Sequence, residues 1–375
     1  MINILSRMNM EMHRNRPLTP EYKKITLWRP SDEFLHCCIE SRGCRFNREK
    51  GACVMCDYGT GRNLDPPELK RALEEELQPQ LQSLSTLLFG SYGSILDTEE
   101  ISEKCLDVIL DFISGKNVRT LIFETHCCTI TDHILKKIKE KLQNNGKNII
   151  IEMGYETSDK FVLENCLNKI LDFGQLCRAI HLIHKYGMKV SLNVFVGAPF
   201  LTEEDQLNTA VESVKWAFDK GADSVVIFPC NIKPFTLVHK LYQDGLYHPV
   251  SQWMMIELLA RIPEEYLDRV NLSWYGDRQN FYENNEFPLI PPEDCDICHK
   301  SIFDFYHVFM RESLAGRRKQ LIENLRREDK KCDCYEKFLE KINIRQSRMK
   351  KKDILQVLEK LENLKDVQRE TGQMV

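Results

Sequence analysis

The stretch Cys44-Arg-Phe-Asn-Arg-Glu-Lys-Gly-Ala-Cys53-Val-Met-Cys56 places three cysteines in one loop, with the spacing C-x8-C-x2-C. Three thiolates do not complete a structural zinc site, which takes four nitrogen or sulfur ligands. They can ligate three irons of a 4Fe–4S cluster and leave the fourth iron open to an outside ligand. A zinc knuckle, completed by a ligand from residues 36–38, is the alternative.

The composition favours a metalloprotein of a reducing compartment. The chain has 375 residues, 42% of them hydrophobic, a net charge of −4 and 15 cysteines. In the cytosol, abundant cysteine indicates metal binding rather than disulfides. The N-terminal residues lack the apolar run of a secretory signal, and no segment has the about 18 consecutive apolar residues of a membrane span. We therefore expect a cytoplasmic protein that does not enter a membrane.

Strands and helices alternate along the chain. Continuous apolar runs separated by amphipathic segments are typical of a parallel sheet covered by helices. The sequence predicts six strands at Phe34–Glu40, Thr86–Phe89, Val118–Phe123, Asn148–Met153, Lys189–Val196 and Ser224–Phe228.

Glycine-rich and polar residues gather directly after each predicted strand. The carboxyl ends of parallel strands share one rim, where ligand sites are built. Because the cysteine loop follows the first strand, it opens onto that rim. The sequence divides into an N-terminal arm (residues 1–33), a segment of alternating strands and helices (34–290) and a C-terminal helical extension (291–375).

These residues resemble the radical S-adenosylmethionine (SAM) superfamily, and within its elongator-like branch the chain is most similar to the radical SAM subunit of archaeosine synthase and its bacterial relatives. The x8 gap departs from the usual x3, and Met55 replaces the usual aromatic residue. The similarity runs from about Cys44 to Cys334. Besides the cysteine loop, the motifs that carry it are Gly90-Ser-Tyr-Gly-Ser-Ile-Leu-Asp97, Gly154-Tyr-Glu-Thr-Ser158, Gly197-Ala-Pro-Phe-Leu-Thr-Glu-Glu204 and Pro229-Cys-Asn-Ile-Lys-Pro-Phe-Thr-Leu-Val238.

The resemblance implies a partial (β/α)6 radical SAM barrel. Cys44, Cys53 and Cys56 would ligate a 4Fe–4S cluster that reductively cleaves SAM to a 5′-deoxyadenosyl radical. An electron donor such as a flavodoxin or ferredoxin would supply the electron. The residues expected to contact the cofactor are Gly90, Ser91, Tyr92, Gly93, Glu124, Glu156, Asn193 and Gly197.

Several residues of these motifs have an alternative interpretation. Glu156 is followed by Thr-Ser-Asp, which is typical of a helix N-terminus. His126 stands where elongator-like relatives have arginine. It is either a substrate-facing acid or base or a polar residue whose hydrogen bonds are made within the protein. Lys233 is either an anion contact or an exposed lysine, and Cys230 is a candidate hydrogen donor.

The C-terminal part contains a second cysteine set and a basic segment. A Cys-x2-Cys and a Cys-x-Cys form a credible four-thiolate site for zinc or an auxiliary iron–sulfur cluster. Arg311–Lys352 holds 15 basic and 7 acidic residues, a local charge of +8 within a chain of −4. It is either an RNA-binding surface or a solvated helix face. The second cysteine set consists of Cys295, Cys298, Cys332 and Cys334.

Three functions are compatible with the sequence. The first, implied by the resemblance, is tRNA base modification, in which a C–N bond of a lysine adduct on a 7-deazaguanine nucleoside is cleaved with a partner subunit. The second is radical SAM chemistry on a small metabolite or a ribosomally made peptide. The third is a non-enzymatic zinc and RNA-binding module. We expect the segment 353–364 to form an amphipathic helix that packs on the barrel or on a partner subunit.

Overall fold

One curved sheet of eight strands forms the centre of the protein. The computed structural model describes residues 3–14, 24–58, 61–273, 289–293, 295–328, 332–344 and 348–371. The strands follow one another in chain order; β1 and β2 are antiparallel and every later pair is parallel. They are β1 (Ile25–Ser31), β2 (Phe34–Ile39), β3 (Thr86–Ser91), β4 (Thr120–Thr125), β5 (Asn148–Glu156), β6 (Lys189–Val196), β7 (Ser224–Pro229) and β8 (Val270–Leu272).

The six predicted strands are confirmed as β2 to β7. The strands β1 and β8 extend the sheet at its two edges and were not predicted. β1 lies in the N-terminal arm, of which residues 15–23 are outside the described part of the chain. Strand order equal to chain order, with a helical segment after most of the parallel strands, gives a mixed α/β half-barrel.

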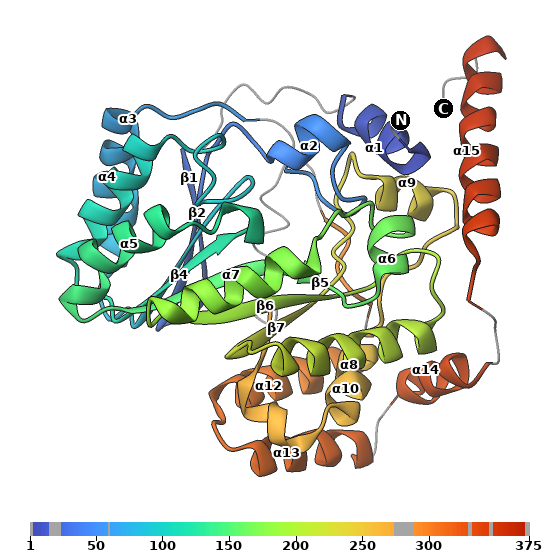
Figure 1. Ribbon diagram of the computed structural model, residues 1–375. Coiled ribbons are helices and arrows are strands. Elements are labelled where there is room, and N and C mark those ends of the chain that lie inside the picture. The colour runs from blue at the N-terminus through green and yellow to red at the C-terminus, as the bar shows by residue number, and fades with distance from the viewer. Residues whose placement is uncertain are drawn as a thin grey trace.

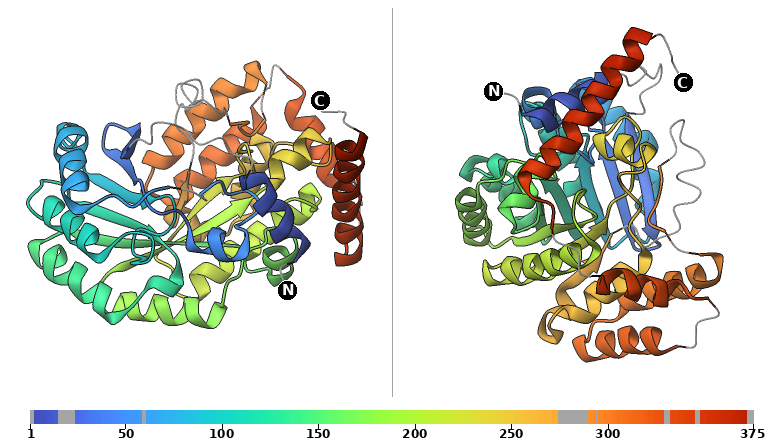
Figure 2. Two further views of the ribbon diagram at one scale, coloured as in Figure 1. Left: turned by 90° about the horizontal axis from the view of Figure 1, so that it is seen from above. Right: turned by 90° about the vertical axis from the view of Figure 1, so that its right-hand side faces the viewer.

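Helices cover the convex side of the curved sheet, and a second group of helices lies at its C-terminal edge (Figure 1). The view from above shows the sheet curling inside the ring of helices (Figure 2). The helices are α1 (Ile4–Arg14), α2 (Arg45–Lys50), α3 (Pro66–Ala72), α4 (Glu103–Ser114), α5 (Asp132–Lys141), α6 (Lys160–Asn165), α7 (Phe173–Lys185), α8 (Glu203–Asp219), α9 (Leu237–Gln243), α10 (Gln252–Arg261), α12 (Asp296–Arg311), α13 (Ala315–Arg327), α14 (Cys334–Asn343) and α15 (Lys351–Thr371). A π-helical turn (Leu73–Leu77) and short 3-10 turns (Gln78–Gln80, Cys127–Thr129, Gln143–Asn145 and Glu264–Arg269) join them.

Most barrel helices begin at a short polar residue whose side chain accepts a backbone N–H of the first turn. Such a cap stabilises a helix by about 1 kcal/mol. Because each cap follows a strand or its loop, the caps also fix the residue at which each helix begins after the rim of the sheet. The capping residues are Asp65, Ser102, Thr131, Asp159, Asp172, Thr202, Thr236 and Ser251.

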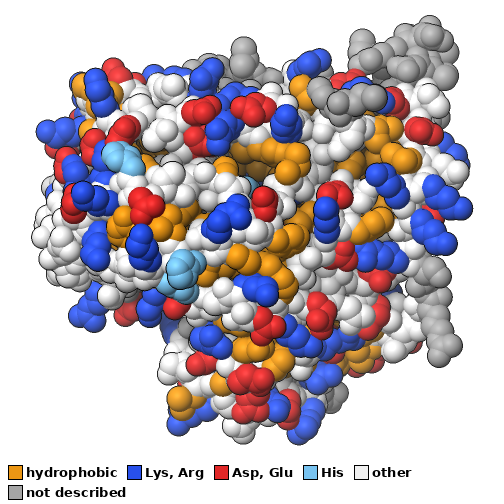
Figure 3. All heavy atoms as spheres, in the orientation of Figure 1, with side chains coloured by type: hydrophobic (Ala, Val, Ile, Leu, Met, Phe, Trp, Pro, Cys, Tyr) orange, Lys and Arg blue, Asp and Glu red, His pale blue; other side chains and the backbone are white. Residues whose placement is uncertain are grey.

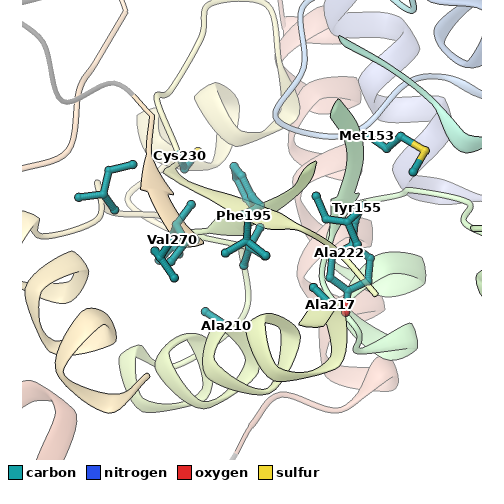
Figure 4. Packing of buried hydrophobic residues seen from close by; sticks show 14 of the residues in the cluster. Met153, Tyr155, Phe195, Ala210, Ala217, Ala222, Cys230 and Val270 are labelled. Carbon is teal, nitrogen blue, oxygen red and sulfur yellow. The ribbon is translucent and has the colours of Figure 1, made fainter. Parts of the chain in front are cut away.

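Alternate residues of each strand face opposite sides of the sheet. On β5, the ring of Tyr155 stacks on Trp216 of α8 at 5.0 Å and meets Phe173 of α7 edge-on, so this side chain points outward. Figure 4 shows Tyr155 directed toward Ala217 of α8. Phe89 of β3 and Phe123 of β4 stack on each other, and the pairing of Phe123 with Ile151 places both on the same face of the sheet as Tyr155. The even-numbered residues of β3, β4 and β5 therefore face the concave side.

The C-terminal helices pack against the barrel through buried polar contacts. Arg318 of α13 is buried, lies over the ring of Phe309, and donates to the backbone carbonyls of Leu267 and Val270 at 2.6 Å each. Glu257 of α10 accepts from Arg326 and from the hydroxyl of Tyr335. Since both contacts join residues far apart in sequence, the extension is fixed on α10 and on the turn that leads into β8.

Helices α1 and α15 pack against each other, and α1 also contacts the cysteine loop. Arg7 of α1 pairs with Glu362 of α15 at 2.6 Å, and Figures 1 and 2 show both helices on the same side of the molecule. The apolar side of α15 is buried through Ile354, Leu358 and Leu361. The predicted helix 353–364 is thus confirmed as part of α15, and it packs on this chain's own N-terminal helix.

Candidate functional site

The three loop cysteines lie at the carboxyl end of β2. Cys44 precedes helix α2, which occupies the wide first gap, and the other two follow the helix. The backbone of Cys44 bonds to that of Tyr58 at 3.1 Å, and the N–H of Tyr58 lies 3.4 Å from the Sγ of Cys56. The N–H of Cys56 donates to the carbonyl of Cys53. These bonds close the segment into one compact turn.

Two asparagines outside the loop hold its backbone. Asn9 of α1 donates to the carbonyls of Gly51 and Cys53, and its own oxygen accepts the N–H of Leu237. Asn168 donates to the carbonyl of Ala52 at 2.7 Å. Because these partners come from three distant parts of the chain, the loop conformation depends on the folded barrel.

Gly51 ends helix α2 with a left-handed backbone (φ +83°). A Cβ at this position would lie 2.6 Å from the carbonyl oxygen of Ser6, so only glycine fits between the loop and α1.

The loop thiols lie among charged groups. Burial raises the pKa of Cys44, raises that of Cys53 to about 12, and raises that of Cys56. Lys169 opposes this shift at Cys53, and Lys233 opposes it at Cys56. Two ammonium groups therefore lie close enough to stabilise thiolates, the form in which cysteine binds metal.

Glu156 ends β5 and lies beside the cysteine loop. Its Oε1 accepts a hydrogen bond from the Nζ of Lys169 at 2.7 Å, and its buried Oε2 has no partner among the described residues. The backbone of Glu156 is left-handed (φ +69°), which is costly for a residue with a side chain. The cap of helix α6 is Asp159, so Glu156 does not cap that helix. Its second oxygen is free to accept a ligand.

The turn after β3 packs directly on the cysteine loop. A Cβ at Gly93 would lie 3.0 Å from the Cα of Cys44. Glu100 accepts the backbone N–H groups of Arg45 and Ser94 at 2.5 Å each and so joins the two segments. The glycine therefore permits this close approach.

Of the other members of the turn, Gly90 and Ser91 are buried and Tyr92 is half-buried. The hydroxyl of Ser91 is buried without a partner in the described structure, and burial raises the pKa of Tyr92 to about 12. Gly90 lies against His36 and Glu124: a Cβ there would lie 2.8 Å from His36 Nε2 and 2.9 Å from Glu124 Oε2.

Glu124 and Asn193 face the concave side from β4 and β6. Burial, with the nearby carboxylate of Glu156, raises the pKa of Glu124 to about 7. Asn193 is buried, and its Oδ1 lacks a hydrogen-bond partner in the part of the chain that is described. Both predicted residues thus come to the inner side of the rim.

His126 caps the 3-10 turn that follows β4. Its Nδ1 lies 3.3 Å from the N–H of Cys128 and 3.2 Å from the same residue's Sγ. Burial lowers the pKa of His126 to about 3, so the ring is neutral near pH 7. These contacts favour a local structural role for this histidine.

The motifs after β6 and β7 are tightly packed. Gly197 has φ +106°, and a Cβ there would lie 2.5 Å from Val250; its carbonyl accepts the hydroxyl of Tyr247 at 2.7 Å. Cys230 is buried. Lys233 pairs with Asp57 of the cysteine loop at 2.7 Å and is therefore not a free surface lysine. The structure thus brings the motif after β7 to the loop.

The tail cysteines come together at the starts of α12 and α14. Their four Sγ atoms all lie within 4.8 Å of one another, and Cys295 and Cys298 are 3.5 Å apart. The backbone N–H of Cys298 helps to lower the pKa of Cys295 to about 7. This set can hold a metal ion. In the described parts of the chain, the loop cysteines do not form a comparably close set.

Many basic side chains of Arg311–Lys352 are engaged within the protein. Arg318 is buried, and others pair with nearby acids. Figure 3 shows basic and acidic side chains interspersed on the face drawn there. These observations favour a solvated helix face, with many of its charges paired, over a continuous RNA-binding surface. The paired residues are Arg317, Lys319, Arg326, Lys337 and Arg348.

Sequence reasoning missed four residues of this site. Lys169 and Asn9 lie in segments without a motif, and only their contacts show their role. Asp57 directly follows the third cysteine, and Glu152 interrupts the apolar run of β5. An acidic residue within an otherwise apolar strand was a usable signal.

The chain resembles subunits of one enzyme. It is 26% identical over 280 residues to archaeosine synthase subunit beta of Methanosarcina acetivorans, which covers 72% of this chain and 76% of the relative. It is 25% identical over 267 residues to the subunit of the same name from Thermococcus kodakarensis, covering 66% and 80%.

Comparison with solved structures and family models adds two findings. The archaeal Elp3 of Methanocaldococcus infernus matches with a TM-score of 0.43 and 14% identity, covering 65% of this chain and 58% of that one. No family model matches the chain. Of the helices that the structure describes, none has the length and apolarity to cross a membrane.

Proposed function

We propose that this chain is a radical SAM enzyme in which Cys44, Cys53 and Cys56 hold a 4Fe–4S cluster. The observation that carries the proposal is the buried Lys169–Glu156 pair beside these thiols, with one carboxylate oxygen left without a partner. Similarity to archaeosine synthase subunit beta supports it. A cluster bound at the rim would supply one electron for the reductive cleavage of SAM.

The residues of the chain fit this group. Among the described residues, the three thiols do not form a close set of the kind that a single zinc ion draws together, whereas each thiolate of a cluster binds a different iron. Lys169 and Lys233 offset the negative charge of the thiolates. These features also argue against a purely structural zinc module.

The surrounding side chains would bind and orient the cofactor. Glu156 Oε2 can accept hydrogen bonds from hydroxyl or amino groups, and Lys169 holds the carboxylate in place through its other oxygen. The turn at Gly90, Ser91, Tyr92 and Gly93 would approach the methionine end with its backbone. We assign Glu124, Asn193 and Gly197 to the same cofactor-facing rim.

The substrate we propose is a modified base in tRNA, on which the chain would act with a partner subunit by C–N bond cleavage. The relatives' name supports this proposal. A second candidate is a small metabolite or a ribosomally made peptide. This candidate is favoured because basic side chains of Arg311–Lys352 form ion pairs with acidic side chains of the protein itself. A flavodoxin or ferredoxin would supply the electron. All 15 cysteines are free thiols, which suits a reducing cytoplasm.

We propose zinc for the tail site. A tetrahedral ion with Zn–S bonds of about 2.3 Å draws four sulfurs close together. Four Sγ atoms within 4.8 Å fit one ion better than an auxiliary cluster, whose thiolates bind separate irons. The ion would fasten α14 to α12.

The test is to measure iron, sulfide and zinc on protein purified without oxygen, with the paramagnetic resonance spectrum of the reduced form before and after adding SAM. We expect about four irons per chain and a spectrum that SAM changes. Cys53→Ala should abolish SAM cleavage while the barrel stays folded; Cys177→Ala, a thiol on α7, is the control. Zinc alone, with no cluster signal, would overturn the proposal.

A binding experiment separates the two substrates. Affinity for tRNA that falls steeply with salt would indicate phosphate contacts. Absence of tRNA binding by a protein that cleaves SAM would favour the small-molecule or peptide substrate.

A further inference from the structure

Basic side chains surround helix α2, which lies within the cysteine loop. Arg48 and Lys50 are on the helix, Arg42 precedes the first cysteine, and Arg14 ends α1. All are exposed except Arg48, which is half-buried. None of the four pairs with an acidic side chain among the residues that the structure describes. We call these four residues the α2 surface.

Helix α1 brings Arg14 to the cysteine loop. Asn47 of α2 forms a hydrogen bond with the ring of His13 at 2.8 Å. At the end of α2, Gly51 lies against the backbone of Ser6, since a Cβ there would be 2.6 Å from the carbonyl oxygen of Ser6. Figures 1 and 2 show the two helices side by side. The α2 surface is thus one feature of the fold, although its residues come from two segments.

Arg45, the third basic residue of α2, differs from the other two. It pairs with Asp97 at 3.1 Å and with Glu99 at 3.0 Å, so its charge is used within the protein. Acidic side chains are therefore available close to the loop, yet the residues of the α2 surface remain outside these pairs.

The charge of the α2 surface is not offset within the described protein. Arg48 donates hydrogen bonds to the backbone carbonyls of Arg42 and Gly43, which hold the guanidinium in place but do not neutralise it. Glu49 lies beside it on α2 and is exposed. Counting Glu49, the surface has a local charge of +3 within a chain whose net charge is −4. A basic surface thus stands out on an acidic protein.

This surface lies close to the expected cluster ligands. Cys44 directly precedes α2, and Cys53 follows its last residue by three positions. A helix of six residues is about 9 Å long, so a protein seated on α2 comes within about one such length of both thiols. The groups that we assign to the cofactor, such as Gly93 and Glu156, are not part of this surface. A partner can therefore approach the cluster without displacing the cofactor.

The sign and the size of the surface indicate the kind of partner. Opposite charges steer an acidic protein to a basic site, and like charges disfavour its binding to the rest of the chain. Encounters between redox proteins bury small interfaces, below about 1,200 Å² in total, which a short helix and its flanks can supply. An RNA would need a longer row of cations and aromatic rings for stacking, whereas Phe46 of α2 is half-buried.

We propose that the α2 surface is the docking site for an acidic protein that reduces the cluster by one electron. The partner loses one electron from its own redox group, and the cluster gains it. This inference rests on the proposed function, because it places the electron donor of that cluster.

The test uses a purified acidic flavodoxin in its hydroquinone form as the probe on the cluster-loaded protein. The double variant Arg42→Glu with Lys50→Glu reverses two exposed charges and keeps Arg48, which holds the loop backbone. Rapid-mixing absorbance gives the second-order rate constant of cluster reduction. At low salt we expect this constant to fall about tenfold or more, because steering raises association rates by about 10–10³-fold. The difference should shrink at 1 M salt, where the Debye length is about 3 Å.

The double variant Arg119→Glu with Lys189→Glu is the matched control. Both residues are exposed and lie at the amino ends of β4 and β6, the opposite ends of the strands from the cysteine loop. The control changes the net charge equally, so its rate constant should stay close to that of the unchanged protein. Reduction by the methyl viologen radical, a small cation, should not slow in either double variant, and the iron content should be unchanged.

Two results with flavodoxin overturn the inference. One is an unchanged rate constant in Arg42→Glu with Lys50→Glu. The other is an equal fall in both double variants, which would reflect net charge alone. A variant that loses affinity for tRNA but is reduced by flavodoxin at the original rate also overturns it, since the surface would then serve RNA.

Calorimetry with oxidised flavodoxin separates the two proposals. If the protein binds flavodoxin through Arg42 and Lys50 but holds no cluster, the proposed function fails while the docking surface stands. If it holds a cluster and cleaves SAM with methyl viologen as the reductant, but flavodoxin does not distinguish the two double variants, the docking surface fails and the proposed function stands.

Discussion

The Nζ of Lys169 donates a hydrogen bond to the Oε1 of Glu156 across 2.7 Å, and both side chains are more than nine-tenths buried. Burial by itself would lower the pKa of Lys169, but the carboxylate of Glu156 raises it above its usual value, and Cys53 contributes in the same direction. One carboxylate oxygen is thereby held in place and the other is left open beside the cysteine loop. A buried ion pair contributes little to stability. We therefore attribute the position of the Lys169–Glu156 pair to ligand binding rather than to folding.

Glu156→Ala should therefore weaken SAM binding. The variant also leaves Lys169 buried and unpaired, which we expect to lower the free energy of unfolding by about 3–5 kcal/mol. Equilibrium dialysis of SAM and denaturant unfolding measure the two effects. Glu164→Ala, which removes a surface acid paired with Lys160, should change neither. An unchanged SAM dissociation constant in Glu156→Ala would remove this residue from the cofactor site.

Asn9→Ala should loosen the cysteine loop. The variant leaves the carbonyls of Gly51 and Cys53 and the N–H of Leu237 without their partner. Unsatisfied buried groups cost about 1–3 kcal/mol each, so we expect a destabilised protein that retains less iron after gel filtration. Asn343→Ala, on the surface of α14, is the control. Full iron retention would show that the loop keeps its shape without α1.

Replacing Cys295 and Cys298 by serine should release the tail metal and leave the loop cluster intact. The Sγ atoms of these residues belong to the compact four-sulfur set. We expect the zinc content to fall, with iron content and cluster absorbance unchanged, and α14 to become more sensitive to protease. Cys128→Ser, at an exposed thiol, should have no such effect. Loss of iron in the double variant would instead identify an auxiliary cluster.

The protein should lose stability as the pH rises from about 5 to about 8. Glu124 and Glu152 keep their protons in the folded state up to about pH 7 and pH 8, whereas the unfolded chain releases them near 4.5. The folded state then holds more protons, so raising the pH favours unfolding. The charges that face Glu124 are Glu156, Lys169 and Lys233. Glu152→Gln should flatten the profile measured by denaturant unfolding; an identical slope would contradict the shifted pKa.

The sequence was sufficient for the parallel sheet because each inner strand is a continuous apolar run. It was insufficient at the two edges. β1 contains Arg29 and Pro30 and pairs antiparallel with β2, and β8 has three residues, so neither carries a periodic signal. Helix α2 within the cysteine gap is likewise too short and charged to be recognised.

The candidate site was predicted only where a motif follows a strand. Cys44, Gly93 and Glu156 could be placed on one rim because parallel strands end together. Lys169 could not, because it sits in an irregular segment after α6 and reaches the site through tertiary packing. The strain at Glu156 and the fit of Gly197 against Val250 are properties of three-dimensional contact that no local pattern encodes.

The bonds that hold the cysteine loop also set an order of events during synthesis. The loop leaves the ribosome early, but Asn168, which holds Ala52, follows 116 residues later. The N–H of Val238, which bonds to the carbonyl of Val54, follows later still. A nascent chain therefore exposes three unheld thiols until most of the barrel has been made. We expect metal to be loaded onto a finished barrel, so that maturation factors meet a folded protein rather than a growing chain.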